Sequence, residues 1–250
     1  WKHRRGTVAA PADPGRNLRI MRRWVATEEG SKDVRARFYL AQELSDVGEL
    51  DEALQHYDWH FRRSGWDDER MMGMMRSCAI HLSRNDLPAA EQCAQRLVEL
   101  RDDWGEGWFA LGRCAYVRAD QKIAKGDQSW RVDSAKAVRH FNRGLQLQPT
   151  NTPLFVDLRE RAVAVHEMLN KALSDLGDID DAVRSAEEGL RSEPANPNLL
   201  FNRAHYKRLL DASLAGGYDE LIVNALVYNP VEVWNEDLHA FVQAKAAARA

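Results

Sequence analysis

Two histidines one helical turn apart are the first residues in the sequence whose spacing suggests chemistry. His56 and His60 lie four positions apart in LDEALQHYDWHFRR, so both imidazoles share one face of the expected helix. A pair of imidazoles so placed can hold a metal ion, as in HExxH sites. No glutamate stands between them and no third ligand is evident, so the alternative is that they pack between helices. We expect no metal site in this chain.

Acidic residues gather at two other places. Asp67-Asp68-Glu69 could supply a general acid, and Asp178-Ile179-Asp180 follows a glycine. Each group stands where an apolar helical stretch begins, and carboxylates are favoured there because a helix N-terminus carries partial positive charge. We interpret both groups as helix starts. No arrangement of serine, cysteine and histidine suggests a nucleophile, and the sequence contains no glycine-rich phosphate loop. We therefore expect no catalytic residue.

The cysteines and the apolar residues indicate in which cellular compartment the protein works and whether it spans a membrane. Cys78, Cys93 and Cys114 lie inside expected helices and form no CxxC pair. An odd number of cysteines without framework spacing is typical of reduced thiols in a cytoplasmic protein, so we expect them to be buried packing residues. No apolar run approaches the about 20 residues that a membrane helix needs. The sequence therefore predicts a cytoplasmic location and no membrane span.

Charge is unevenly spread along the chain. The formal net charge is −3, yet residues 1–23 contain seven Lys or Arg and a single acid, Asp13. One interpretation of this basic end is a contact with phosphate or nucleic acid; the other is a linker followed by the solvated face of a first helix. No interleaved aromatic residues support the first interpretation, and the rest of the chain is acidic. We expect no nucleic-acid partner.

A short sequence motif that occurs twice indicates the fold. Gly48–Ala53 (GELDEA) recurs as Gly177–Ala182 (GDIDDA), and the second phrase leads to Pro194 twelve residues after its alanine. The same alanine-to-proline interval separates Ala137 from Pro149. A glycine turn followed by such a helix is typical of a tetratricopeptide (TPR) hairpin, and a period of about 30–50 residues indicates a solenoid. The sequence predicts an all-α, right-handed solenoid of antiparallel hairpins.

The hairpins are expected to break near Gly48, Asn85 and Gly177, because glycine and asparagine favour the left-handed conformation that ends a helix. Thr152-Pro153 and Asn196-Pro197 each resemble a cap before a helix-starting proline. The expected organisation is a linker from a missing upstream domain over 1–15, a leading helix over 16–32, about five TPR-like hairpins over 33–230 with an insertion near 119–133, and a C-terminal helix over 231–250.

The first hairpin carries a more specific resemblance. Residues 35–69, RARFYLAQELSDVGELDEALQHYDWHFRRSGWDDE, resemble the helical region appended to family 2 glycosyltransferases. The matching features are Arg37 before Phe-Tyr-Leu-Ala-Gln, the turn from Gly48 to Ala53, Tyr57, and the closing Gly65–Glu69 segment. Upstream, His3 and Arg16-Asn17-Leu18 stand where the family has a histidine and an Arg-Asn-Leu helix.

This resemblance implies a parent enzyme that moves a sugar from a nucleotide-sugar donor with the help of a divalent metal. The family holds its metal with an Asp-x-Asp in an α/β domain, and this chain lacks such a domain; its own Asp178-Ile179-Asp180 lies in a hairpin turn. The histidine near the position of His3 helps hold that metal in the family. The chain itself would need no cofactor. It would be the non-catalytic C-terminal part that recruits an acceptor protein or assembles the enzyme; the alternative is a free-standing TPR adaptor with no enzymatic role.

Helical repeats of this kind bind protein or peptide partners on a concave face lined by the first helix of each hairpin. The lysine, asparagine and arginine clamp of TPR cochaperones is absent, and flexible methionines suit an adaptable peptide surface. The alternative is that the same residues bury against other segments of the chain. The face is expected to show Phe38, Gln42, Met72, Met75, Phe109, Arg113, Tyr116, Phe201 and His205.

Overall fold

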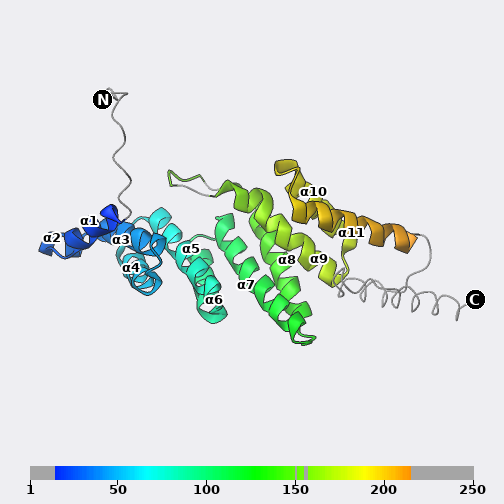
Figure 1. Ribbon diagram of the computed structural model, residues 1–250, viewed down its shortest axis with the longest axis horizontal. Coiled ribbons are helices and arrows are strands. Elements are labelled where there is room, and N and C mark those ends of the chain that lie inside the picture. Colours follow the sequence, from blue (N-terminus) through cyan, green and yellow to red (C-terminus); the bar gives the residue numbers. More distant parts are fainter. Residues whose placement is uncertain (1–14, 150, 155–156, 215–250) are drawn as a thin grey trace, which may run out of the picture. The chain divides into compact units, whose positions relative to one another are not determined.

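The computed structural model of this chain describes residues 15–149, 151–154 and 157–214 (Figure 1). All regular secondary structure within those residues is helical, which confirms the expected all-α class. The expected linker up to residue 14, the end of the fifth hairpin and the C-terminal helix lie outside the described residues, as does His3. The described residues divide into two compact units, the first ending at Asp86 and the second beginning at Leu87.

The first unit is built on a helical hairpin. Asp33 caps its first helix by accepting a hydrogen bond from the Ala36 amide at 3.0 Å. Ala41 and Ala53 are both fully buried, which confirms that small residues let the two helices of the hairpin approach closely. The leading helix expected over 16–32 is divided in two, and its short second part, capped by Thr27, precedes the hairpin. The helices are α1 (Arg16–Val25), α2 (Glu28–Lys32), α3 (Val34–Asp46), α4 (Leu50–Arg63) and α5 (Asp67–Ser83).

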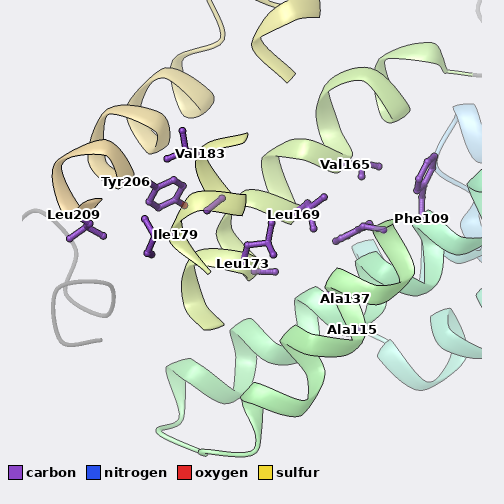
Figure 2. Close-up of a cluster of buried hydrophobic side chains, with 13 residues drawn as sticks. Phe109, Ala115, Ala137, Val165, Leu169, Leu173, Ile179, Val183, Tyr206 and Leu209 are labelled. Atoms are coloured by element: carbon purple, nitrogen blue, oxygen red, sulfur yellow. The ribbon is translucent and has the colours of Figure 1, made fainter. Parts of the chain in front are cut away.

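The second unit is a sequential array in which each helix packs against the next (Figure 1). Its main core runs from Phe109 at one end to Leu209 at the other (Figure 2). Apolar side chains of five successive helices meet there, so each helix is held by helices that are its neighbours in the sequence. The elements are α6 (Leu87–Leu100), α7 (Gly105–Ala124), α8 (Trp130–Gln146), the π-helical turn η1 (Glu160–Ala164), α9 (Val165–Leu176), α10 (Ile179–Ser192) and α11 (Pro197–Leu214).

The three expected helix breaks are confirmed. Gly48, Asn85 and Gly177 have φ values of 85°, 59° and 94°, which lie in the left-handed region. The extra residues expected as an insertion near 119–133 mostly lengthen helices: α7 continues to Ala124, a turn at Gly126 follows, and α8 begins at Trp130.

The two expected helix starts before proline have different outcomes. Asn196 does cap α11, because its side-chain oxygen accepts a hydrogen bond from the Leu199 amide at 3.0 Å. The expectation for Thr152-Pro153 is wrong. Thr152 accepts a bond from the Leu154 amide within a turn, and helix begins only after Asp157, whose carboxylate accepts from the Arg159 amide at 2.9 Å. Asp157 therefore takes the capping role that the threonine was expected to fill.

The contact between α7 and α8 predicts an unusual response to a glycine substitution. A Cβ on Gly112 would lie 2.6 Å from two ring carbons of Phe141, which is fully buried. Glycine to alanine inside a helix ordinarily stabilises by about 1 kcal/mol. We expect Gly112→Ala instead to lower the free energy of unfolding by about 1–3 kcal/mol, because the ring must be displaced in a packed core. Urea denaturation measures the difference.

Asn142→Ala is the matched control, since Asn142 is exposed on α8 and the substitution leaves the core untouched. Adding Phe141→Leu to Gly112→Ala should recover part of the loss by removing the ring. A Gly112→Ala protein as stable as the Asn142→Ala control would contradict the tight packing of α7 on α8.

Candidate functional site

Two phenylalanines that were expected on a binding face are buried. Phe38 is 2% exposed and Phe109 is 0% exposed, so the expectation that they are partly exposed is wrong. Phe38 packs against the rings of Tyr57 and His60, with centroids 6.3 Å and 5.1 Å away. Phe109 belongs to the main core of the second unit (Figure 2). Both rings face a neighbouring helix, where burial of apolar area stabilises them.

The remaining members of the expected face keep some exposure. In the first unit, Gln42, Met72 and Met75 are half-buried, and Met72 also packs against the core of that unit. In the second unit, Tyr116 is half-buried against the main core, and the ammonium of Lys171 lies 5.8 Å from its ring centre. These residues therefore contribute to packing while part of each side chain stays accessible.

Arg113 is not a free cation. Its guanidinium forms an ion pair with Glu160 of η1, a residue 47 positions later. Burial raises the pKa of Glu160, and the positive charge of Arg113 opposes that shift. This pair joins α7 to η1, so the charge expected to meet a partner is already used within the chain.

Further polar contacts join α9 to its neighbours. Lys171 of α9 lies 3.5 Å from Asp120 of α7 and 3.0 Å from Asp175. Asn170, fully buried, accepts hydrogen bonds from Asn202 at 2.8 Å and from the Tyr206 hydroxyl at 3.1 Å, both on α11. With the Arg113–Glu160 pair, these bonds hold α7, α9 and α11 side by side along one row.

An exposed aromatic pair lies on α11. Phe201 is 56% exposed and stacks on His205, with centroids 6.5 Å apart and ring planes within 6° of each other. Burial lowers the pKa of His205, and nearby Arg208 lowers it further, so the imidazole is neutral at neutral pH. A large exposed aromatic ring fixed by a second ring can anchor a partner through stacking and apolar contact.

We use the name helix row for these accessible side chains of the second unit. It consists of Arg113, Tyr116, Lys171, Asn202, Phe201 and His205. Arg113, Lys171 and Asn202 have partners within the chain, so the feature that the row offers to a ligand is the exposed Phe201–His205 pair.

Several residues within the segment 35–69 contact one another across its helices. The Arg35 guanidinium lies 5.2 Å from the Trp66 ring centre and 2.8 Å from the Glu69 carboxylate, and the other Glu69 oxygen lies 3.4 Å from His60 Nε2. Glu69 and His60 are both buried. The motif at residues 35–69 therefore includes the contacts that fix α5 onto the α3–α4 hairpin.

The two histidines do not converge. His60 faces Glu69, whereas His56 Nδ1 lies 3.2 Å from the guanidinium of Arg37. Among the described residues, no group of three or more His, Cys, Asp or Glu side chains is arranged to hold a metal ion. The two imidazoles therefore contact different residues, although they lie on the same face of α4.

The interpretation of the acidic groups as helix starts is confirmed. Helix α5 begins at Asp67, and Asp178 immediately precedes α10. The interpretation nevertheless missed that Glu69 is buried and pairs with His60. The three cysteines are buried, as expected. Within the described part of the chain, no helix is both long and apolar enough to cross a membrane.

Comparison with known proteins adds no assignment. No protein-family model matches the chain, and no curated protein matches it.

Proposed function

We propose that this chain is a TPR-type scaffold whose helix row binds a protein or peptide partner. The supporting observation is the exposed Phe201–His205 pair at the end of a row of first helices that polar contacts hold side by side. Repeated GELDEA and GDIDDA phrases and left-handed turns at Gly48 and Gly177 support a right-handed solenoid of TPR hairpins. Rigid helices suit such binding because little ordering is needed when a peptide docks.

Within this proposal the chain is the non-catalytic C-terminal part of a glycosyltransferase, where it recruits the acceptor or assembles the enzyme. What supports this is the resemblance of residues 35–69 and the fact that Arg35, Trp66 and Glu69 of that segment contact one another. The nucleotide sugar and the divalent metal would belong to the catalytic domain. Reading the gene upstream of Trp1 tests this directly: an α/β domain with an Asp-x-Asp supports it, and its absence favours a free-standing adaptor.

Peptide binding is expected to depend on Phe201. A random 12-residue peptide library is panned against the full chain, and a selected peptide is titrated by fluorescence anisotropy. We expect Phe201→Ala to raise the Kd by about 5- to 150-fold, as loss of an aromatic anchor does. His205→Ala should have a smaller effect because it removes the supporting ring.

Val132→Ala provides the matched control. Val132 is 58% exposed, close to the 56% of Phe201, but it lies on α8, outside the helix row. Its substitution should leave the Kd unchanged. Equal loss in both variants, or no loss in Phe201→Ala, would remove the support for this binding surface.

A further inference from the structure

Two arginines of the first unit lie over the same indole ring. The guanidinium carbons of Arg37 and Arg63 lie 4.9 Å and 4.5 Å from the ring centre of Trp59. Arg37 belongs to α3, and Arg63 ends α4 beside Trp59. Cation–π attraction holds both side chains in place. Both guanidiniums are therefore held by the same indole ring at this end of the hairpin.

Neither arginine has a carboxylate partner among the described residues, in contrast to the other arginines around them. Arg35 pairs with Glu69, Arg62 with Asp58 and Arg70 with Asp67, at 2.8 Å in each case. A guanidinium is always charged, and Arg37 is half-buried, where a charge without a counter-charge is costly. Among the arginines of α3, α4 and α5, only Arg37 and Arg63 lack such a counter-charge.

Arg37 also has unused hydrogen-bonding capacity. It is half-buried, and its Nε is buried with no acceptor in the structure. Its contact with a side-chain hydrogen-bond acceptor is from Nη1 to His56 Nδ1, at 3.2 Å. Since the guanidinium can only donate, His56 Nδ1 must accept and the imidazole is neutral. His56 thus orients Arg37 without balancing its charge.

The nearest acidic group to this histidine is engaged elsewhere. Glu52 lies 3.7 Å from His56 Nε2, on the ring nitrogen that faces away from Arg37, and it is 2.7 Å from Arg22 of α1. Glu52 shares Arg22 with Glu49, and neither carboxylate forms an ion pair with Arg37 or Arg63.

We propose that Arg37 and Arg63, held on Trp59, bind an oxyanion group of the carboxylate or phosphate type. The planar fork of arginine donates two parallel hydrogen bonds to either group, and such charge-assisted bonds are strong. The indole and His56 fix the donors in advance, which lowers the ordering needed when the anion arrives. This site is separate from the helix row and does not depend on the proposed peptide binding.

The test uses the full chain and two simple anions. Arginine Nε–Hε signals are recorded by ¹⁵N NMR while inorganic phosphate or acetate is added, with sodium chloride keeping the ionic strength constant. The Arg37 signal is identified by its loss in Arg37→Lys. We expect this signal to shift and saturate with phosphate, acetate or both. Saturation with phosphate alone identifies a phosphate site, and saturation with acetate alone identifies a carboxylate site.

Two neighbouring arginines of α4 supply the variant and its control. Arg63 is exposed, so Arg63→Gln should fold normally and weaken anion binding by about tenfold or more. Arg62→Gln removes an equal charge from a paired arginine and should leave binding unchanged. The proposal is overturned if neither anion shifts the Arg37 signal beyond the chloride control. It is also overturned if Arg63→Gln has no effect or if Arg62→Gln has the same effect.

Discussion

Phe109→Ala is expected to lower the free energy of unfolding of the second unit by about 3–5 kcal/mol, because it opens a cavity in a close-packed core. Phe109 is fully buried and lies at one end of the cluster in Figure 2. Its ring also contacts Gly105 and Gly144, so two helices are closely packed around it. The surrounding helices cannot move in to fill this cavity without losing their contacts with the other helices packed against them.

The measurement is urea denaturation combined with amide hydrogen exchange, because exchange reports on each of the two units individually. Exchange should accelerate in α7 and α8 while the first unit is unchanged. Phe201→Ala is the matched control: its ring is exposed, so its loss should change stability by less than about 0.5 kcal/mol. A Phe109→Ala protein with wild-type stability would contradict the core position of this residue.

Glu69→Ala is expected to destabilise the first unit by about 1–3 kcal/mol, because it leaves a buried donor without an acceptor. His60 is fully buried, and its Nε2 faces the Glu69 carboxylate at 3.4 Å. Arg35, which also loses its partner, is largely exposed and can be solvated instead. Glu69→Gln keeps an acceptor oxygen in the same place, so it should lower the free energy of unfolding by less than Glu69→Ala does. Thermal and urea unfolding of the two variants gives the comparison.

The same pair predicts a dependence on pH. Burial lowers the pKa of His60; Glu69 opposes that shift, and the positive charge of Arg70 adds to it. A lowered folded-state pKa means that the unfolded chain takes up a proton first as the pH falls below about 6.5. Stability is therefore complete above that pH and declines as the pH falls toward the folded-state value.

The variant His60→Gln tests whether His60 contributes to this loss of stability at low pH. Glutamine keeps a neutral donor toward Glu69 but does not titrate, so the stability lost between about pH 7 and about pH 5 should be smaller than in the wild type. Burial also lowers the pKa of His56, His140, His166 and His205, so part of the loss will remain. An unchanged loss in His60→Gln would exclude His60 as a contributor, and a wild type more stable at the lower pH would contradict the sign.

The fold was predictable because local signals and packing agree. Glycine or asparagine marks each of the three expected breaks, and apolar residues recur at helical spacing between them. The lengthening of α7 and α8 was harder to foresee. Residues 119–133 contain a turn at Gly126, and only the packed hairpin shows that both flanks continue as helix.

The candidate face was predictable only in part. Sequence spacing placed Phe38, Phe109 and Phe201 on first helices but could not tell which ring faces a neighbouring helix and which faces solvent. The partner of Arg113 could not be identified either, because Glu160 is 47 positions away and lies in a π-helical turn. Tertiary packing determines both which ring is buried and which residue pairs with Arg113, and no local sequence pattern indicates either.

Hydrogen exchange of the full chain with and without a selected peptide tests the proposed binding surface most directly. Protection by the peptide should appear in the first helices of the second unit, on α7, η1, α9 and α11, and should be lost in Phe201→Ala. The Val132→Ala protein should show the wild-type pattern. Protection confined to α8 and α10, or a pattern unchanged by Phe201→Ala, would contradict the account.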